Sequence, residues 1–271
     1  MMSSRTISAP RRPLSTAVLR VGVLSAVIFG LAGGLSGCNT VRGWFRSDEQ
    51  KAAAPLELAD FSASATVSRL WSVGVGKGEG RLGIRQRPVV LDGRVYAAAV
   101  EGGVRAYDLE SGAQVWRHET EAGVSGGPGA GDGLVVYGTL EGAVIALDAA
   151  TGEQKWAAQV NNEIIAPPVI GQGTVLVRSN DGRVTAFGAD DGERRWFWNH
   201  DLPNLTVRGN DGPTLGPGYV FVGSDDGTVS ALSLSDGRPI WEQAVAQPDG
   251  RSELDRMADV DGAPVLDDFQ P

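Results

Sequence analysis

Cysteine and histidine are almost absent from this chain, which has one cysteine and two histidines in 271 residues. A single cysteine excludes an internal disulfide framework and a zinc site built from several thiolates. The histidines, His118 and His200, are too few for a multi-histidine metal site, and no Ser/His/Asp grouping accompanies them. We interpret both as strand-end or surface residues, and the sequence predicts neither a metal, nor a cofactor, nor a catalytic centre.

Basic residues are also scarce, with 24 lysines and arginines against 33 acidic residues and a net charge of −9. Four of the arginines lie within residues 1–37, so the rest of the chain is more acidic still. Nucleic acids and anionic membrane surfaces attract proteins through basic patches. We therefore expect no nucleic acid among the partners of this chain.

Acidic residues are missing altogether from residues 1–37, and the apolar run "VGVLSAVIFGLAGGL" there is only 15 residues long. A membrane-spanning helix needs about 20 apolar residues, so this run is short for one. Arginines followed by an apolar run and small residues are typical of a secretory signal peptide. The pattern predicts a signal peptide over residues 1–37, with a transmembrane helix as the weaker alternative.

The only cysteine, Cys38, follows this segment directly. The ending Leu-Ser-Gly-Cys resembles the lipobox of bacterial lipoproteins, in which the cysteine becomes the lipidated first residue, with palmitate among its acyl chains. A free thiol or an intermolecular disulfide is the alternative. In lipoproteins of this kind an aspartate after the cysteine favours the inner membrane, so Asn39 implies the periplasmic face of the outer membrane. Residues 38–60 are interpreted as a tether, and 61–271 as the folded domain.

Residues 102–116, 142–156, 182–196 and 227–241 repeat one pattern, with alanine fifth, glycine eleventh and tryptophan fifteenth. Tandem units of about 40 residues indicate a solenoid or a propeller. Ligand platforms occur once, whereas these residues recur in every unit, so we predict structural roles for them. They are Trp71, Trp116, Trp156, Trp196, Trp241, Gly112, Gly152, Gly192 and Gly237.

Turn dipeptides divide each unit into four apolar runs. In the first unit they are Asp92-Gly93, Glu101-Gly102 and Ser111-Gly112, and equivalent pairs recur in the others. Such pairs tolerate the positive φ of tight hairpins, so each unit is predicted to be a four-stranded antiparallel meander. The fold class is therefore all-β, a β-propeller of four-stranded blades, with about four and a half blades in this chain.

The segment "ALDAATGEQKW" resembles the repeat of quinoprotein-like, PQQ-type propellers. Together with the lipobox, two further segments resemble those of the BamB-type outer membrane assembly lipoproteins. They are "LPNLTVRGNDGP" at 202–213 and "ELDRMADVDGAPV" at 253–265. The resemblance implies a propeller of eight blades, so we interpret this chain as a truncated member of that type.

The resemblance also implies a function and partners. It implies a noncatalytic scaffold of the BAM complex that binds a POTRA domain of BamA and aids insertion of β-barrel proteins, with nascent outer membrane proteins as further partners. The implied contacts are Leu205, Val207, Arg208, Asp259 and Asp261. Apolar side chains beside an arginine suit a binding hot spot, which facing aspartates can orient. Val207 replaces a typical leucine, and an ordinary inter-blade loop is the alternative.

Two other functions remain open at this point, because a propeller fold alone does not fix function. A periplasmic PQQ-dependent dehydrogenase needs a cofactor pocket and calcium ligands, and many carry a disulfide of adjacent cysteines that this chain cannot form. A generic ligand-binding propeller is the second alternative. The segment "GEGRLG" at 78–83 fits a dinucleotide-binding spacing, but the sequence after it does not read as a helix.

Overall fold

The computed structural model describes residues 64–78, 83–84, 86–206, 211–247, 249–252, 254–255, 257–260 and 262–267. By its contacts the chain divides into two compact units, Met1–Thr66 and Val67–Pro271, and all the strands named below belong to the second. The predicted signal peptide, Cys38 and the tether lie outside the described residues.

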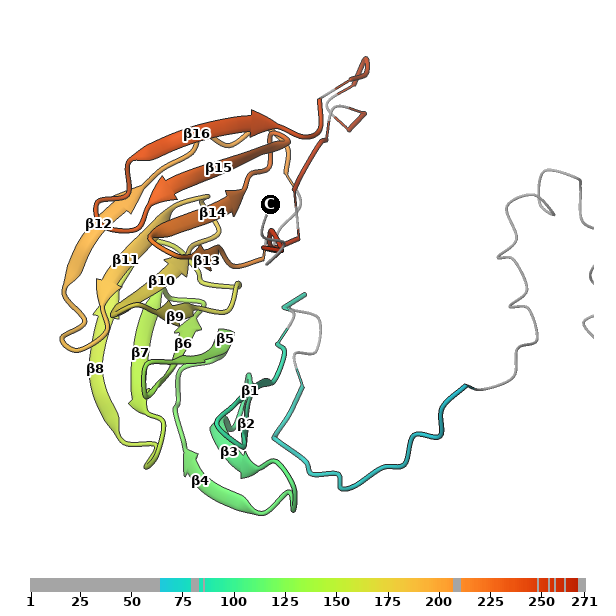
Figure 1. Ribbon diagram of the computed structural model, residues 1–271, viewed down its shortest axis with the longest axis vertical. Helices are drawn as coiled ribbons and strands as arrows, with labels where there is room; N and C mark the ends of the chain where they lie inside the picture. Colours follow the sequence, from blue (N-terminus) through green and yellow to red (C-terminus); the bar gives the residue numbers. More distant parts are fainter. Residues whose placement is uncertain are drawn as a thin grey trace, which may run out of the picture. The chain divides into compact units, whose positions relative to one another are not determined.

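The described residues form four separate antiparallel sheets of four strands each (Figure 1). Blade 1 consists of β1 (Val89–Leu91), β2 (Arg94–Ala99), β3 (Gly103–Asp108) and β4 (Gln114–His118), and blade 2 of β5 (Val124–Gly131), β6 (Leu134–Thr139), β7 (Ala143–Asp148) and β8 (Gln154–Gln159). Blade 3 consists of β9 (Val169–Gly171), β10 (Thr174–Arg178), β11 (Val184–Gly188) and β12 (Arg194–Trp198), and blade 4 of β13 (Thr214–Gly216), β14 (Tyr219–Gly223), β15 (Thr228–Ser233) and β16 (Pro239–Ala244).

Every blade is a simple meander in which strands adjacent in the sequence are paired. The first turn of blades 1 to 3 carries positive φ at both central residues, for example 47° at Asp132 and 72° at Gly133. In blade 4 only Gly218 has positive φ, because the ring of Pro217 fixes its φ at a negative value. The predicted all-β fold of four-stranded blades is confirmed.

The repeated alanine of the third strand lies directly opposite the repeated tryptophan of the fourth. In blade 2 the paired residues are Ala146 and Trp156, and a β-bulge follows the alanine. The same pairing and bulge recur in the other three blades. Because the alanine side chain is small and fully buried, it leaves room for the large indole of the tryptophan opposite it.

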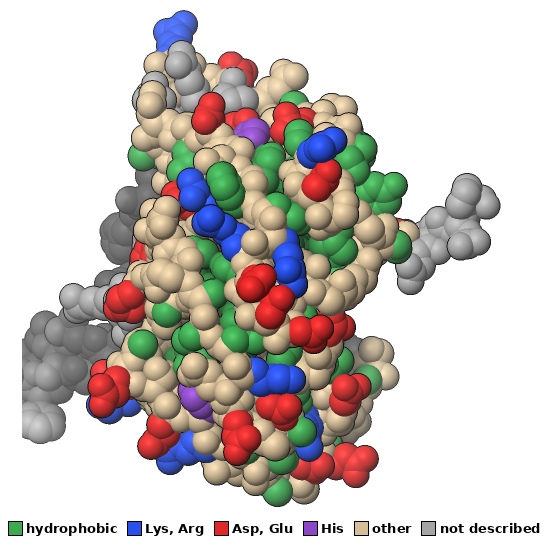
Figure 2. Space-filling view, turned by 90° about the vertical axis from the view of Figure 1, so that its left-hand side faces the viewer, with side chains coloured by type: hydrophobic (Ala, Val, Ile, Leu, Met, Phe, Trp, Pro, Cys, Tyr) green, Lys and Arg blue, Asp and Glu red, His purple; other side chains and the backbone are tan. Residues whose placement is uncertain are grey.

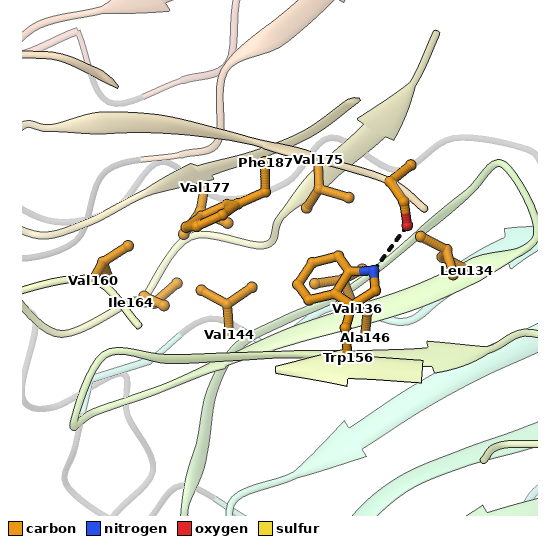
Figure 3. Close-up of a cluster of buried hydrophobic side chains, with 11 residues drawn as sticks. Leu134, Val136, Val144, Ala146, Trp156, Val160, Ile164, Val175, Val177 and Phe187 are labelled. Atoms are coloured by element: carbon orange, nitrogen blue, oxygen red, sulfur yellow. Dashed lines mark hydrogen bonds between the residues drawn. The ribbon is translucent and has the colours of Figure 1, made fainter. Parts of the chain in front are cut away.

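From that position Trp116, Trp156 and Trp196 reach into the next blade, where each indole donates its N–H to a backbone carbonyl, and Trp71, which precedes the first strand, makes the same bond to blade 1. The bonds run from Trp71 Nε1 to Leu109 O (2.9 Å), Trp116 Nε1 to Ala149 O (2.9 Å), Trp156 Nε1 to Ala189 O (2.8 Å) and Trp196 Nε1 to Leu234 O (2.8 Å). Figure 3 shows the bond of Trp156 as a dashed line. A buried N–H needs such a partner, so the contact fixes how neighbouring blades are aligned.

The same indoles lie against the repeated turn glycine of the next blade. A Cβ at this glycine would lie 2.5–2.6 Å from the tryptophan ring, which is too close for any side chain. The glycines also have φ between 68° and 77°, where an L-residue is strained. The pairs are Gly112 with Trp71, Gly152 with Trp116, Gly192 with Trp156 and Gly237 with Trp196.

An aspartate shapes two of these turns. The Asp148 carboxylate accepts hydrogen bonds from the backbone N–H groups of Ala150 (2.9 Å) and Thr151 (3.0 Å), and the Gly152 N–H donates to the Asp148 carbonyl (2.8 Å). The backbone bonds from Thr151 and Ala150 hold the pKa of Asp148 below its ordinary value. Asp108 makes the equivalent bonds in blade 1. The turn glycine is thereby held in place before the indole covers it.

Buried side chains gather between neighbouring blades. Figure 3 shows the cluster between blades 2 and 3, in which Trp156 and Val144 face Val175, Val177 and Phe187. Similar clusters join blade 1 to blade 2 and blade 3 to blade 4. Burying one large apolar side chain contributes about 1.5–3 kcal/mol. The stability of each blade therefore depends on its neighbours.

Trp241 of blade 4 differs from its counterparts. It is 47% exposed, whereas Trp116, Trp156 and Trp196 are 7–8% exposed. Its ring lies 6.0 Å from that of Phe221, on a face of blade 4 that no further blade covers within the described residues. The repeated tryptophan is therefore buried only where another blade follows it.

This arrangement predicts unequal roles for two equivalent tryptophans. Trp156→Phe removes the donor to the buried Ala189 carbonyl, so we expect a loss of roughly 1–3 kcal/mol in the free energy of unfolding. Trp241→Phe should change it by no more than about 0.5 kcal/mol, because Trp241 is half exposed. Denaturant unfolding of both variants measures the difference, and equal losses would contradict the inter-blade role of the indole.

A second prediction separates steric contact from backbone strain. Gly133 and Gly152 both have positive φ, 72° and 77°, but only Gly152 lies under an indole, that of Trp116. Gly133→Ala should cost about 1–2 kcal/mol of stability from strain alone. Gly152→Ala should cost a further 1–3 kcal/mol or so, because the ring must move. Equal melting temperatures for the two variants would show that the indole can move aside without a loss of stability, which would contradict the prediction.

Candidate partner-binding surface

The first predicted segment, residues 202–213, connects blade 3 to blade 4. Leu202 and Leu205 in it are large apolar side chains that are 40% and 41% exposed. Val207 and Arg208, two of the predicted contacts, lie outside the described residues. Both leucines are thus available at the surface for contact with a partner.

The chain entering this segment is held by His200. Its Nε2 lies 2.8 Å from Oδ2 of Asp226, whose Oδ1 accepts a hydrogen bond from the Thr228 hydroxyl at 2.7 Å. Burial raises the pKa of Asp226, but the hydrogen bonds from His200 and Thr228 outweigh it and leave the pKa below its ordinary value. The ring of His200 also stacks near Trp198, with the centroids 5.3 Å apart. The histidine thus ties the end of blade 3 to the second hairpin of blade 4.

The other end of the segment is held by two arginines. Arg87 Nη2 lies 2.5 Å from Oδ1 of Asp211, and Arg178 Nη1 donates to the Asp211 carbonyl at 3.3 Å. Arg178 also pairs with Asp225 at 3.4 Å, and these two side chains are only 4% and 3% exposed. Breaking a buried ion pair by removing one partner costs about 3–5 kcal/mol. The pair therefore fixes the second hairpin of blade 4 against blade 3.

The second predicted segment packs on the same hairpin from the opposite side. The Val260 N–H donates to the Ser224 carbonyl at 3.1 Å, and a Cβ on Gly223 would lie 2.6 Å from the Val260 side chain. Asp259 is half-buried, and Asp261 lies outside the described residues. Further along the segment, Pro264 accepts a hydrogen bond from Thr214 of blade 4.

The second predicted segment therefore contacts one short hairpin, residues 223–228 of blade 4, directly, and side chains of blade 3 link the first segment to the same hairpin. His200 reaches Asp226, Arg178 joins Asp211 to Asp225, and Val260 bonds to Ser224. Of the five predicted contact residues, the structure describes Leu205 and Asp259. The supporting residues Arg178, Asp225 and Asp226 were not predicted. The only signal for them is the doubled aspartate, Asp225-Asp226, where the equivalent hairpin of blade 2 has Leu140-Glu141.

Two cavities bear on the ligand-binding alternatives. One of about 10 Å³ lies beside Arg178 and Asn180, which is about the space of a single water molecule. The other, of about 410 Å³, lies between blades 3 and 4 and is lined by Gln172, Thr174, Arg195, Trp196, Gly218, Leu234 and Ser235. This volume suits a small ligand, but the lining includes neither a carboxylate nor a histidine.

Within the described part of the chain, no group of three or more His, Cys, Asp or Glu residues is arranged to hold a metal ion. A search of the same residues finds no helix with the length and apolarity that a membrane crossing requires. The histidines lie apart, His118 at the end of β4, 3.3 Å from the Tyr137 hydroxyl, and His200 beyond β12. Burial raises the pKa of Tyr137 above its ordinary value.

Comparison with known proteins shows which family this chain resembles. The family model for the outer membrane protein assembly factor BamB matches residues 100–270. BamB of Xanthomonas campestris pv. campestris is 56% identical over 246 residues, which cover 86% of this chain and 61% of that protein. BamB of Pseudomonas aeruginosa is 48% identical over 241 residues, which cover 89% of this chain and 62% of that protein.

Solved structures agree with this. The crystal structure of BamB from Moraxella catarrhalis matches with a TM-score of 0.62 at 30% identity, over 67% of this chain and 55% of that one. A europium-containing methanol dehydrogenase matches with a TM-score of 0.52 at 20% identity, over 66% of this chain and 44% of that one, and shares the fold alone.

The chain spans about three-fifths of the length of the two BamB proteins from Xanthomonas and Pseudomonas. The match to the family nevertheless covers more than half of this chain, and it includes blades 2 to 4 and both predicted segments. Together with the two related proteins and the solved structure, it shows that the chain belongs to the family of the outer membrane protein assembly factor BamB.

Proposed function

We propose that this chain is a noncatalytic scaffold lipoprotein of the BAM complex that binds a POTRA domain of BamA. In this role it aids the insertion of β-barrel proteins into the outer membrane, with nascent outer membrane proteins as further partners. The observation that supports the proposal is that Val260 of the second segment bonds to the hairpin 223–228, while Arg178 joins Asp211 of the first segment to Asp225 of the same hairpin. Two segments far apart in the sequence thus share one support.

The proposed contact residues have distinct roles. Leu205 and Val207 supply apolar contacts, and exposed apolar side chains near an arginine are typical of binding hot spots. Arg208 bonds to the partner, and Asp259 and Asp261 orient its guanidinium through charge-assisted hydrogen bonds. Because a buried ion pair fixes the hairpin, this support requires little reordering when a partner binds.

The relatives favour a scaffold over an enzyme. Both long matches are named as assembly factors, whereas the methanol dehydrogenase shares only the fold. Propellers of this type host unrelated functions, so the enzyme relative carries no weight for the activity of this chain. The larger cavity between blades 3 and 4 is the one observation that keeps a ligand-binding role as a second candidate.

The first test concerns Arg208. Arg208→Ala should leave the melting temperature unchanged, because an exposed charge contributes no more than about 0.5 kcal/mol to stability. It should weaken BamA binding by ~2–5 kcal/mol, the cost of truncating one member of an interfacial charge set. Pull-down and calorimetry with purified BamA POTRA domains measure the effect. The control is Arg238→Ala, which replaces an exposed arginine of blade 4 outside both segments.

The coupling of the two segments can be measured directly. The double variant Arg208→Ala/Asp261→Ala should lose less binding than the sum of the single variants, because the two residues act in one network. Additive losses would place them in separate contacts. The assignment of Arg208 and Asp261 to the BamA-binding site would be wrong if both single variants bind normally. It would also be wrong if they lose binding only to the extent that they unfold.

The second test concerns the anchor. We propose that Cys38 carries lipid and holds the chain at the periplasmic face of the outer membrane, since each buried CH₂ of an acyl chain adds ~0.8 kcal/mol. Cys38→Ala should move the protein from the membrane fraction to the soluble periplasm or leave it unprocessed. Membrane fractionation and mass measurement of the mature chain provide the readout. Wild-type behaviour of Cys38→Ala in both would count against lipidation.

A further inference from the structure

The outer edge of blade 3 combines an open strand with basic and aromatic side chains. β12 is the last strand of its sheet, and no strand among the described residues pairs with its outer edge. Figure 2 shows the side of the molecule on which the outer strands lie, and basic side chains run across its middle between scattered acidic ones. An unpaired edge presents a row of free N–H and C=O groups that can accept another strand.

Phe197 is the exposed aromatic residue of this strand. It is 50% exposed and lies next to the last residue of β12, Trp198. The guanidinium carbon of Arg183 lies 4.9 Å from the ring centroid, and that of Arg194 lies 5.7 Å from it. Arg183 is held there by a hydrogen bond from its Nε to Asn199 Oδ1 at 2.7 Å. Two positive charges therefore flank one exposed aromatic ring.

The strand that carries this group is rigidly held. Trp196 and Trp198, on either side of Phe197, are each 8% exposed and pack in the cluster between blades 3 and 4. Thr185 pairs with Phe197 in the register of β11 and β12 and is itself buried. The edge of β12 is thus presented in an extended conformation without a folding cost on binding.

The other blades lack this combination. The residue that follows the repeated tryptophan is Arg117 in blade 1, Ala157 in blade 2 and Glu242 in blade 4. Only blade 3 has an aromatic residue there. The packing of the propeller does not require one, since Ala157 occupies the equivalent position in blade 2, whose own interfaces are fully formed.

We propose that the outer edge of β12 binds an extended acidic peptide segment of another protein as an added strand. Carboxylates of that segment pair with Arg183 and Arg194, and an apolar side chain of the segment lies on Phe197. The partner's charge follows from complementarity, because this group is basic in a chain with a net charge of −9. Neighbouring Arg195 takes no part, since it already pairs with Asp191 at 2.6 Å. The proposal is independent of BamA binding.

The mode of binding follows from the geometry of a strand. Main-chain hydrogen bonds along the edge supply affinity, and alternate side chains of the added strand supply specificity. Residues two apart on the added strand point to the same side, so carboxylates at alternate positions can face Arg183 and Arg194 together. Because both arginines lie beside the ring of Phe197, the apolar side chain must point to that same side. A segment with acidic, apolar and acidic residues at positions i, i+2 and i+4 is therefore the simplest ligand for this edge.

The test uses the full chain with two blocked eight-residue peptides, one with glutamate, valine and glutamate at alternate positions and threonine between them, and the other with lysine in place of each glutamate. Calorimetry measures binding, and hydrogen exchange measures protection of the β12 amides. The glutamate peptide should bind and slow exchange in β12, and the lysine peptide should do neither. Binding should weaken as salt is raised, because these charges are exposed.

Variants separate this site from other edges. Arg183→Gln/Arg194→Gln should weaken binding of the glutamate peptide by roughly two- to tenfold, the value of two exposed ion pairs. Phe197→Ala should weaken it as well. Arg117→Gln on β4, an exposed arginine of another outer strand, is the matched control and should bind normally.

Four outcomes would overturn the proposal. They are equal binding of both peptides, protection of β4 or β16 in place of β12, normal binding by the double arginine variant, and concentration-dependent self-association that protects β12 without peptide. Thermal melts of every variant show whether a loss of binding reflects unfolding.

Discussion

One contact organises this structure: the indole of a tryptophan lies on the turn glycine of the following blade and donates its N–H to a carbonyl beside it. The residues around it make it possible. The third-strand alanine gives the indole room, the glycine accepts its close approach, and in blades 1 and 2 an aspartate such as Asp148 also shapes the turn. Because the donor and the acceptor belong to different blades, the contact sets the position of one sheet relative to the next.

The energetics of the domain follow from this nearest-neighbour contact. Apolar clusters occur between blades, so a blade is stabilised by what lies on either side of it. Trp241 shows the consequence, since the same residue at the same repeat position is half exposed where no described blade follows. The interfaces leave the hairpins and outer strands largely free, and both proposed binding surfaces lie there.

The fold was predictable because its determinants recur. The spacing of Trp116, Trp156 and Trp196 and the turn dipeptides identified the blades, and the structure has the strands those turns imply. The support of the candidate site was not predictable in the same way. Arg178 and Asp225 are 47 residues apart, and each occurs once, so no periodicity marks them as partners. The assignment of Val207, Arg208 and Asp261 as contact residues depends on family resemblance. A resemblance indicates which residues contact a partner, but not which side chains hold them in place.

Function in a repeat fold is therefore best sought where the repeat is broken. Positions that repeat are explained by packing, because every blade needs them. The departures are the five extra residues between Trp196 and Trp241, the doubled aspartate at 225 and 226, and the phenylalanine at 197. The doubled aspartate joins blade 4 to blade 3 through Arg178 and His200, and Phe197 lies on an open edge with two arginines beside it. Phe197 belongs to none of the apolar clusters between blades, so it needs an explanation outside the fold, and a binding partner is the simplest one.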